Sequence, residues 1–545
     1  MSILGKKWVL RYKRKPDETL WAALLEARTI GDPDTFFSNA SLDDLHDPFL
    51  FSDMEKAVDR LQRAINRRER IVVYGDYDVD GLSGTALLIH TLRMLGAEVS
   101  YRVPHRREDG YGLHKKYIEE LAVQKVSVLI TVDLGISCKD EVAIAQKSGI
   151  DVIITDHHTL PQTLPEAFAT LHPKLASTYP FNELSGSGVA FKLACALLQR
   201  TKNEDWIPHL TDLASLGTVA DCVPLVGENR AIVKLGLAQM KNTRWEGLKA
   251  ILKIAGSWEK EFTPQTIGFQ IGPRLNASGR LESPYWGLQA LLANAETALE
   301  KCEKLEELNR RRQDMMGKII EEAEVAINPE DAILIAAGPW SSGIVGLVAG
   351  RLQEKYGKPV FILEDRGDSL VGSARSLPGF HCVEALQKVA PLLETFGGHE
   401  QAAGFHLKKE NYEAFKATLL KHAQEVFEKT PLERKLNIDF TLKGEDLNLE
   451  NCEKVADFAP FGVGNETPLF LLEEVEILSV HPVGKEEKHL KFEGKTDGKF
   501  FEGIGFQFGP FTENLHAAKQ LVVHLEKNEW QDRTSLQLRL VDFSS

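Results

Sequence analysis

The chain has 545 residues, of which 43% are hydrophobic and 26% charged, a balance that excludes disordered and membrane-spanning classes. This length predicts several domains, each with its own core. The net charge of −14 argues against indiscriminate binding to duplex DNA, because contacts to phosphates require basic surfaces. The basic runs Lys13–Lys15, His105–Arg107 and Arg310–Arg312 nevertheless leave room for a localised basic groove.

The six cysteines are scattered, without the close pairs of a zinc site or a redox motif. We expect buried thiols in a reducing compartment. The N-terminus has no apolar segment of the kind found in secretory signals, and no apolar run is long enough to span a membrane. The sequence therefore predicts a cytoplasmic protein.

Residues 1–70 show a mixed helical pattern that is interrupted by Pro33 and Pro48. The apolar run Leu20–Leu25 indicates one helix in this N-terminal extension, but no motif in it suggests chemistry. We expect the extension to pad the domain that follows it.

Residues 71–285 alternate short β-branched runs with helical patterns, which predicts an α/β domain with a mainly parallel sheet. We expect four acidic or histidine motifs to close buried strands of this sheet. The motifs are Gly75-Asp76-Tyr77-Asp78-Val79-Asp80-Gly81, Val132-Asp133, Asp156-His157-His158 and Ala220-Asp221. Ligands bind outside the carboxyl ends of parallel strands, so these side chains should meet at one edge of the sheet.

Carboxylates gathered at one edge would repel one another unless cations held them together. Oxygen ligands combined with an imidazole suit divalent ions such as Mn²⁺ or Mg²⁺. Two such ions roughly 3.5–4 Å apart can activate a water and hold both oxygens of an in-line displacement. A single Asp at a strand end is more often a turn former or a helix cap, so the prediction depends on the combination. The combination predicts a two-metal hydrolase.

The alternating acids Asp76, Asp78 and Asp80 followed by Gly81 also match the start of a calcium-binding loop. That loop lies between helices and has a Glu at its twelfth position. Here the preceding run is apolar and β-branched, and the twelfth position counted from Asp76 is Leu87. The sequence therefore disfavours a calcium-binding hand.

Three further blocks follow the α/β domain. Apolar residues at helical spacing over 286–327 predict one long connecting helix. Residues 328–430 again alternate strand and helix patterns, which predicts a second α/β domain. Residues 431–545 break into short strands with turn signals such as Gly494-Lys495-Thr496-Asp497-Gly498, which fits a small barrel of the OB type.

The acidic motifs resemble those of the DHH phosphoesterase superfamily, which includes the RecJ exonucleases. Three later segments resemble RecJ motifs in particular, namely the linker motif Gly272–Leu281, the DHH-associated signature Gly397–Phe405 and the Pro460–Asn465 segment that begins the C-terminal domain. The similarity spans nearly the whole chain in the expected order. It implies a parallel-sheet DHH catalytic domain, a connecting helix, a DHH-associated substrate-binding domain and an OB-like nucleic-acid-binding β-barrel.

The resemblance also implies roles for individual residues. The implied metal ligands are Asp76, Asp78, Asp80, Asp133, His157 and Asp221. Asp133 is the candidate to bridge two ions, Asp78 and Asp80 should divide between them, and Asp76 should ligate only weakly. We expect His158 to act in catalysis by orienting a neighbour or stabilising the phosphate, with a capping or packing role as the alternative.

The second domain and the linker motif should orient the substrate. Arg side chains bind phosphate oxygens bidentately, and small residues let backbone N–H groups approach them. The implied phosphate or sugar contacts are Arg280, Ser373, Arg375, Gly398 and His399, with Arg274, Asn276 and Ser278 as additional candidates. In the C-terminal block Phe500, Phe501, Phe506 and Phe508 could stack on bases, but alternating Phe is more often barrel core, so no stacking residue is assigned.

The function implied by the resemblance is a single-stranded-DNA-specific exonuclease that releases mononucleotides from the 5′ end in repair and recombination. Its cofactors would be two divalent ions, Mn²⁺ first and Mg²⁺ as the alternative. Its partners would be single-stranded DNA, a single-stranded-DNA-binding protein and a RecQ-type helicase, with the enzyme acting as a monomer. A small-substrate phosphoesterase would normally end after the second domain, and an inactive scaffold would lack metal ligands; neither fits this sequence as well.

Overall fold

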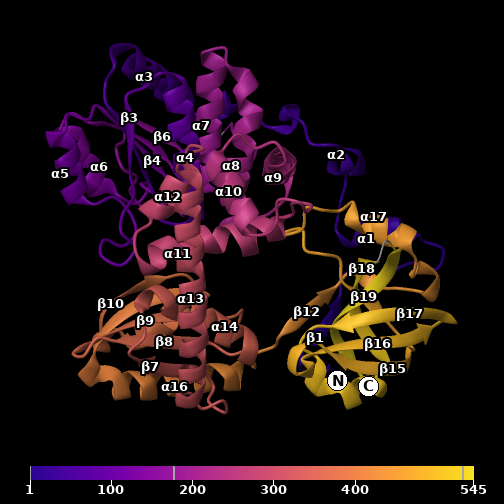
Figure 1. The fold of residues 1–545 in the computed structure, drawn as a ribbon. Helices are drawn as coiled ribbons and strands as arrows, with labels where there is room; N and C mark the ends of the chain where they lie inside the picture. Colours follow the sequence, from indigo (N-terminus) through magenta and orange to yellow (C-terminus); the bar gives the residue numbers. More distant parts are fainter. Residues whose placement is uncertain (1, 176–177, 531–532) are drawn as a thin grey trace. The chain divides into compact units, whose positions relative to one another are not determined.

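The computed structural model describes residues 2–175, 178–530 and 533–545 (Figure 1). The chain divides into two compact units. The terminal unit comprises residues 1–39, 431–461 and 465–545, and the central unit comprises residues 40–430 and 462–464. Within the described residues, no helix has both the length and the apolar character that a membrane span requires.

The first domain of the central unit is built on a five-stranded parallel sheet, as predicted. In spatial order its strands are β3 (Val99–Arg102), β2 (Ile71–Gly75), β4 (Val128–Val132), β5 (Asp151–Thr155) and β6 (Ala169–Leu171). One face packs on α3 (Met54–Arg67), α4 (Val79–Met94) and α7 (Gly186–Arg200). The other face packs on α5 (Lys115–Val123) and α6 (Lys139–Lys147). Burial on both faces explains why the strands read as continuous β-branched runs.

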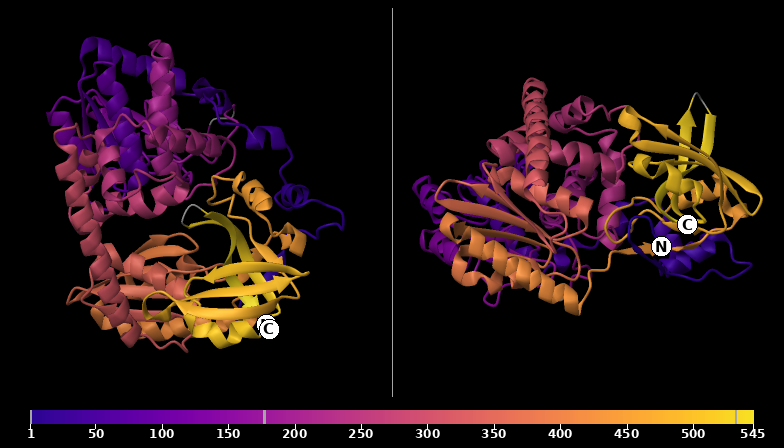
Figure 2. Two further views of the ribbon diagram at one scale, coloured as in Figure 1. Left: turned by 45° about the vertical axis from the view of Figure 1, so that its right-hand side comes forward. Right: turned by 90° about the horizontal axis from the view of Figure 1, so that it is seen from below.

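A helical layer follows this sheet in the sequence. Its elements are η3 (Glu204–Leu210), α8 (Thr211–Ala220), α9 (Gly227–Met240), α10 (Glu246–Ile254), the π-helix η4 (Thr266–Ile271), α11 (Gly272–Leu281), α12 (Tyr285–Leu291) and α13 (Ala298–Ala326). The prediction of one helix over 286–327 was wrong at its start. The Asn294 side chain accepts hydrogen bonds from Thr297 N and Oγ1 at 3.1 and 2.9 Å, and this local competition accompanies the break between α12 and α13. The remaining 29-residue helix α13 connects the two domains of the central unit (Figures 1 and 2).

The second domain of the central unit has a mixed five-stranded sheet in the order β10-β11-β9-β8-β7. The strands are β7 (Leu334–Gly338), β8 (Val360–Asp365), β9 (Ser369–Arg375), β10 (Leu393–Gly398) and β11 (Ala402–Lys408). The helices are α14 (Ser342–Tyr356), α15 (Cys382–Lys388) and α16 (Tyr412–Lys429). The Gly-containing segment around Arg375 suggests a turn, but Arg375 ends strand β9, where buried and partly exposed residues alternate. The strand fixes its position more firmly than a turn would.

The terminal unit contains a seven-stranded sheet in the order β13-β14-β18-β19-β17-β16-β15. The strands are β13 (Phe440–Thr441), β14 (Phe470–Leu472), β15 (Glu476–Val483), β16 (His489–Thr496), β17 (Lys499–Gly505), β18 (Gln520–Trp530) and β19 (Arg533–Ser544). The helices are α1 (Leu20–Ala27), α2 (Pro33–Phe37), α17 (Leu449–Ala456) and α18 (Thr512–His516). Phe501 and Phe508 are buried in its core, whereas Phe500 and Phe506 are exposed.

The expectation that the whole N-terminal extension pads the first domain was wrong for residues 1–39. Strand β1 (Lys7–Leu10) pairs in parallel with β12 (Lys435–Ile438), and α1 packs into the core of the terminal unit. Buried Arg28 forms an ion pair with buried Asp439, at 3.0 Å between Nη2 and Oδ2. Only the later part of the extension, which includes α3, packs on the parallel sheet. The β1–β12 pairing and the Arg28–Asp439 ion pair join residues more than 400 positions apart, and no local pattern predicts them.

Candidate metal centre and phosphate site

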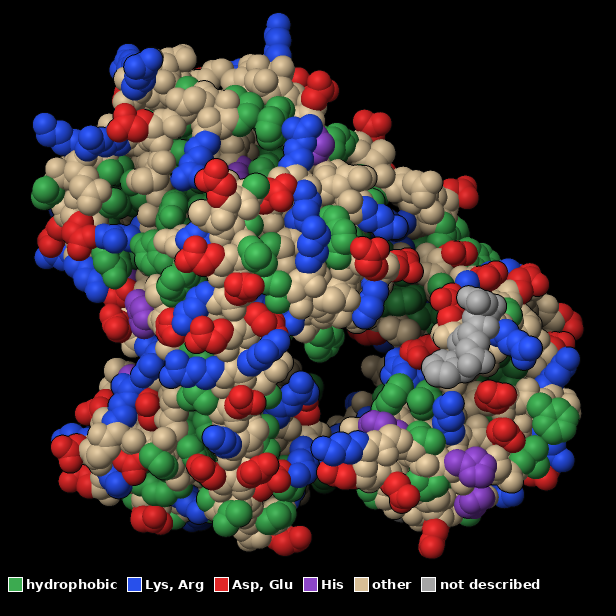
Figure 3. Space-filling model, in the orientation of Figure 1, with side chains coloured by type: hydrophobic (Ala, Val, Ile, Leu, Met, Phe, Trp, Pro, Cys, Tyr) green, Lys and Arg blue, Asp and Glu red, His purple; other side chains and the backbone are tan. Residues whose placement is uncertain are grey.

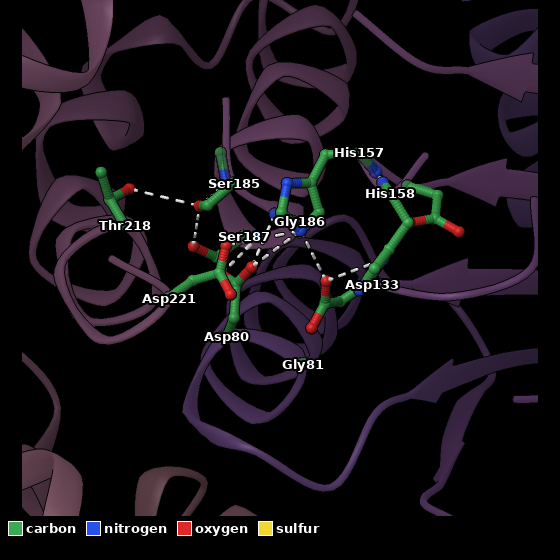
Figure 4. Close-up of polar contacts among 12 residues, drawn as sticks. Asp80, Gly81, Asp133, His157, His158, Ser185, Gly186, Ser187, Thr218 and Asp221 are labelled. Atoms are coloured by element: carbon green, nitrogen blue, oxygen red, sulfur yellow. Dashed lines mark hydrogen bonds and ion pairs between the residues drawn. The ribbon is translucent and has the colours of Figure 1, made fainter. Parts of the chain in front are cut away.

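The predicted acidic and histidine motifs meet at one end of the parallel sheet (Figure 4). Asp76 directly follows β2, Asp133 follows β4, and the Asp156-His157-His158 segment follows β5. Three groups of potential ligand atoms each lie within 4.8 Å of one another. The groups are Asp76, Asp78 and Asp133; Asp80, His157 and Asp221; and Asp133, His157 and His158.

Asp221 reaches this cluster from a helix rather than from a strand, which corrects the prediction for the fourth motif. It is the C-cap of α8, which packs against α4 and α7. The contact is close because residue 217 is glycine: a Cβ atom there would lie 2.1 Å from Asp80 Oδ1. The apolar stretch before Asp221 therefore serves helix packing, and the helix end delivers the carboxylate.

Asp80 is held by the N-terminus of α7. Its two carboxylate oxygens accept hydrogen bonds from Gly186 N at 2.6 Å and Ser187 N at 2.9 Å. These two hydrogen bonds from backbone N–H groups at the helix start orient the Asp80 side chain within the cluster. Its Oδ2 lies 3.9 Å from His157 Nε2.

Asp133 lies at the centre of the cluster. It is buried, has a φ of +61°, and places Oδ1 3.1 Å from His157 Nε2. Burial, followed by the charges of neighbouring carboxylates led by Asp80, raises the pKa of Asp133 well above its usual value. Burial and the same kind of repulsion raise the pKa of Asp221 to about 8. A positive φ is uncommon for residues other than glycine, so the surrounding structure holds Asp133 in this conformation. At this position a negative charge on Asp133 is unfavourable unless a cation balances it.

The side chains of this cluster fit divalent cations. Asp76 Oδ1, Asp133 Oδ1 and His157 Nε2 are buried and have no hydrogen bond from any part of the chain that the structure describes. Buried polar atoms without partners are costly and rare in folded proteins. Divalent cations would coordinate these atoms and also offset the repulsion between the carboxylates. The donor set of carboxylates with one imidazole suits Mn²⁺ or Mg²⁺.

Asp156 organises the histidines, a role that the sequence analysis did not assign. Its carboxylate accepts hydrogen bonds from Ile136 N, His157 N and His158 N, and Oδ1 lies 2.8 Å from His158 Nδ1. Burial acts against ionisation, but these hydrogen bonds hold the pKa of Asp156 below its usual value. Burial alone would lower the pKa of His158, but the hydrogen bond and the charge of Asp156 raise this pKa to about 9. The contact with Asp156 therefore favours the protonated form of His158, which is the form that could stabilise a phosphate.

A cluster of arginines lies beside the carboxylates. Arg280 Nη1 donates to Gly343 O at 3.2 Å, Arg375 Nη1 donates to Ser373 Oγ at 3.1 Å, and the Arg106 guanidinium lies 4.7 Å from the centre of the Tyr77 ring. Burial, with the charges of Arg106, Arg312 and Arg375, lowers the pKa of Arg280 to about 9. Among the described residues none of Arg106, Arg280 and Arg375 forms an ion pair with a carboxylate, so the cluster is suited to an anion.

Arg106 belongs to this cluster, although the sequence analysis names it only within the basic run His105–Arg107. The run Arg310–Arg312 contributes less than expected. Arg310 pairs with Glu306 at 2.9 Å and Arg311 with Glu282 at 3.8 Å. Figure 3 shows basic side chains interspersed with acidic ones over this face of the central unit. Their neighbours therefore neutralise the charges of Arg310 and Arg311, whereas the charge of Arg312 acts on Arg280.

The remaining predicted substrate contacts divide into two groups. Gly398, with a φ of +143°, and exposed His399 form the β10–β11 turn, and His399 N donates to the carbonyl of Ala402, the residue paired with Arg375. These positions are compatible with the prediction. Asn276 also remains a candidate, because its Oδ1 atom is buried without a hydrogen bond from the described chain.

Two predicted contacts from the linker motif have structural roles. Ser278 is fully buried and donates to Leu275 O, so the prediction that it contacts substrate was wrong. Arg274 pairs with Glu306 at 2.7 Å and donates to Gln270 O at 2.7 Å. Its guanidinium is used to hold η4, α11 and α13 together, and it is not free to bind a phosphate in this arrangement.

The first domain has a parallel sheet with a carboxylate–histidine cluster at its edge, and a helix joins it to a mixed sheet that carries Arg375. This architecture defines a DHH-type phosphoesterase. The chain matches the DHH family N-terminal domain over residues 70–218, the DHHA1 domain over 330–427 and the RecJ OB domain over 438–542. The chain belongs to the RecJ family.

Two curated relatives, both named single-stranded-DNA-specific exonuclease RecJ, illustrate the similarity. The Bacillus subtilis (strain 168) protein is 36% identical, and the match covers 92% of this chain and 64% of the relative. The Haemophilus influenzae protein is 34% identical, and the match covers 90% of each chain. The crystal structure of RecJ in complex with Mn²⁺ from Thermus thermophilus has a TM-score of 0.85 and 28% identity, and the match covers 100% of this chain and 80% of that one.

Proposed function

We propose that this protein is a single-stranded-DNA-specific exonuclease that hydrolyses phosphodiester bonds from the 5′ end and releases 5′-mononucleotides. The observation that carries the proposal is the juxtaposition of two incomplete sites in one unit. The carboxylate–histidine cluster has buried ligand atoms without hydrogen bonds in the described chain, and three arginines beside it have no acidic partner there. The carboxylates need a cation and the neighbouring arginines need an anion. A phosphate held at a metal centre meets both needs.

In this proposal Asp76, Asp78 and Asp133 would hold one divalent ion, and Asp80, His157 and Asp221 would hold the second. Asp133 Oδ1 lies 3.1 Å from His157 Nε2, so it links the two ligand groups. Ions bound there would lower the pKa of a water molecule and polarise the reacting phosphate. Mn²⁺ or Mg²⁺ fits the donors, and the Thermus thermophilus relative is described in complex with Mn²⁺ and with Mg²⁺. The chain itself orients the ligands through Asp156 and the N-terminus of α7, and it presents the positive charge of His158 to the phosphate.

The arginine cluster would select the strand end. Arg375 is held by Ser373 and flanked by Arg280 and Arg106, an arrangement that can surround a terminal phosphate on several sides. A phosphate bound there places the first phosphodiester bond toward the metal centre, because Asp78 is a neighbour of both Arg106 and Arg280. Release of one nucleotide at a time follows from such an arrangement.

We expect Arg375→Ala to raise KM for 5′-phosphorylated single strands about 10- to 100-fold, the range for losing hydrogen bonds to a charged group. The preference for 5′-phosphate over 5′-hydroxyl ends should shrink, because the mutation removes a contact to that phosphate. The measurement is steady-state kinetics on both substrates at matched salt. The control is Arg67→Ala, at an exposed arginine on α3. It should leave KM unchanged for both the 5′-phosphorylated and the 5′-hydroxyl substrate. An equal loss on both ends would make Arg375 a general backbone contact.

Removing residues 431–545 alone would expose the apolar face of α1, since residues 1–39 fold with the C-terminal part. A chain of residues 40–430 should instead keep its fold and hydrolyse very short oligonucleotides, while its affinity for long single strands falls. Circular dichroism checks the fold, and a titration with labelled DNA gives the affinity. Normal binding of long strands by this folded fragment would show that the OB-type domain does not contribute to DNA binding.

The proposal includes partners and location. An exonuclease specific for single strands requires a source of them, which a RecQ-type helicase would supply, and single strands in cells are covered by a single-stranded-DNA-binding protein. Action in the cytoplasm follows from a DNA substrate in a bacterial-type enzyme. Action as a monomer is supported by the ligand set, because one chain supplies all of it.

A substrate panel tests the proposed function. Purified protein with Mn²⁺ is incubated with end-labelled single-stranded DNA, duplex DNA, RNA and pyrophosphate. We expect single-stranded DNA to be degraded in preference to duplex, with no turnover of pyrophosphate. Faster hydrolysis of pyrophosphate would indicate a small-substrate phosphoesterase, and no hydrolysis of any substrate would indicate an inactive scaffold.

A further inference from the structure

Phe269 is an aromatic side chain that the metal centre and the arginine cluster do not use. It is 73% exposed, and it lies in the π-helix η4 directly before α11. Single exposed apolar residues are ordinary on protein surfaces, so exposure alone carries no meaning. A π-turn is uncommon, however, and such turns occur frequently at functional sites. The position of the ring relative to the site therefore decides its significance.

The continuous helical segment formed by η4 and α11 has two faces. Ile267, Ile271 and Leu275 recur every fourth residue and are fully buried, so they form the core-facing stripe. Successive residues turn by about 100° in an α-helix and by somewhat less in a π-helix, which places Phe269 within roughly 30° of Arg280 around the axis. Phe269 and Arg280 thus lie on the same face, opposite the core stripe.

Helix α11 itself packs along the metal-binding loop. A Cβ atom at Gly279 would lie 3.5 Å from Tyr77 O, and one at Gly272 would lie 3.8 Å from Val79 Cγ2. Helix α11 therefore follows the backbone between Asp76 and Asp80. With a rise of about 1.5 Å per residue, Phe269 lies about 16 Å along the axis from Arg280. The ring is outside the arginine cluster, but it is on the same helix and the same side.

The backbone that carries the ring is held on both sides. Arg274, anchored by Glu306, donates to Gln270 O at 2.7 Å, and the Gln270 side chain contacts Ser257 Oγ. An aromatic side chain on a fixed backbone loses little conformational entropy when a flat ligand stacks on it. The buried Asn276 Oδ1, which has no hydrogen bond from the described chain, provides a polar atom between Phe269 and Arg280.

We propose that Phe269 is a stacking platform for a nucleobase of the strand whose 5′-phosphate is held by Arg280. This inference rests on the proposed function and adds a base-binding position to it. A stacked strand advances about 3.4 Å per nucleotide and an unstacked one further, so the base is roughly three to five nucleotides from the 5′ end. Every base has a π-face, so the platform accepts any sequence, as a processing exonuclease requires.

The test compares Phe269→Ala, Phe269→Leu and Phe269→Trp on a 5′-phosphorylated oligothymidylate and on a 5′-phosphorylated dinucleotide. Stacking on an aromatic ring predicts that Ala and Leu raise KM for the long strand about 5- to 100-fold, while Trp stays within about threefold of Phe. The dinucleotide is too short to span from Arg280 to the ring, so its KM should not change. Leu299→Ala, at another exposed apolar side chain of the central unit, is the matched control.

A second readout locates the base without turnover. In an Asp133→Asn background, 2-aminopurine placed at successive positions of the strand should be quenched at one internal position, and Phe269→Ala should remove that quenching. A KM for the dinucleotide that rises equally would show that Phe269 supports the fold of α11, and wild-type kinetics for Phe269→Leu would show that no ring is needed. Either result overturns the inference while single-strand hydrolysis persists, whereas failure of the wild-type protein to degrade single strands overturns the proposed function instead.

Discussion

Asp133→Ala should lower the rate of single-strand hydrolysis by on the order of 1,000-fold or more, because losing even an outer partner of a metal ligand typically costs 10- to 100-fold. Asp133 belongs to the group with Asp76 and Asp78, and its Oδ1 lies 3.1 Å from Nε2 of His157 in the second group, so its removal affects both proposed ion positions. Binding of single-stranded DNA should persist, since the arginine cluster is intact. The measurement is turnover at saturating Mn²⁺, with DNA affinity determined separately.

Stability provides an independent check on the same residue. Because burial and neighbouring carboxylates raise the pKa of Asp133, its charge opposes folding when no ion is bound. Metal-free Asp133→Asn should therefore be at least as stable as the metal-free wild type, and it should gain less stability from Mn²⁺. Asp212→Asn is the matched control, because Asp212 is equally buried but hydrogen-bonds to Trp245 away from the cluster. Substantial turnover by a folded Asp133→Ala protein would show that Asp133 is not a required metal ligand.

Asp439→Ala should destabilise the terminal unit by about 3–5 kcal/mol, the cost of removing one partner of a buried ion pair. Asp439 accepts from Arg28 Nε and Nη2 at 3.1 and 3.0 Å and from Leu469 N at 2.8 Å, so its loss leaves a buried guanidinium and a backbone N–H without their partner. Urea unfolding, followed by a probe placed in the terminal unit, measures the change.

Glu433→Ala is the comparison for this prediction. Glu433 forms an exposed ion pair with Lys7 between the same two segments of the chain, and exposed pairs contribute about 0–1 kcal/mol. Equal, small effects of Asp439→Ala and Glu433→Ala would mean that the N-terminal segment is not held by the buried pair.

The sequence predicts the centre of the site well because its signals are local. Asp76 and Asp133 end β-branched runs that are buried on both faces, and parallel strands must bring their carboxyl ends to one edge. The long connecting helix is predictable from its apolar periodicity, except where the side chain of Asn294 interrupts it. The identities of the metal ligands came from resemblance, and geometry then added Asp156 as the residue that holds the histidines.

Features that depend on distant contacts were not predictable. Asp221 comes from a helix end that reaches the cluster only because Gly217 allows close packing. The pairing of residues 1–39 with the C-terminal part has no local pattern, since it depends on β1–β12 pairing and on the Arg28–Asp439 contact. A π-turn before α11 has no sequence signature either, so the exposure of Phe269 could be found only in the structure.

The most direct test of the account is the identity of the first product released from a 5′-phosphorylated single strand with Mn²⁺ present. A strand labelled at its 5′ end should give labelled 5′-mononucleotide from the earliest time points, while the same strand labelled at its 3′ end should shorten gradually. Early release of a labelled mononucleotide from the 3′ end, or of internal fragments from either strand, would contradict the assignment of the arginine cluster to the 5′ end.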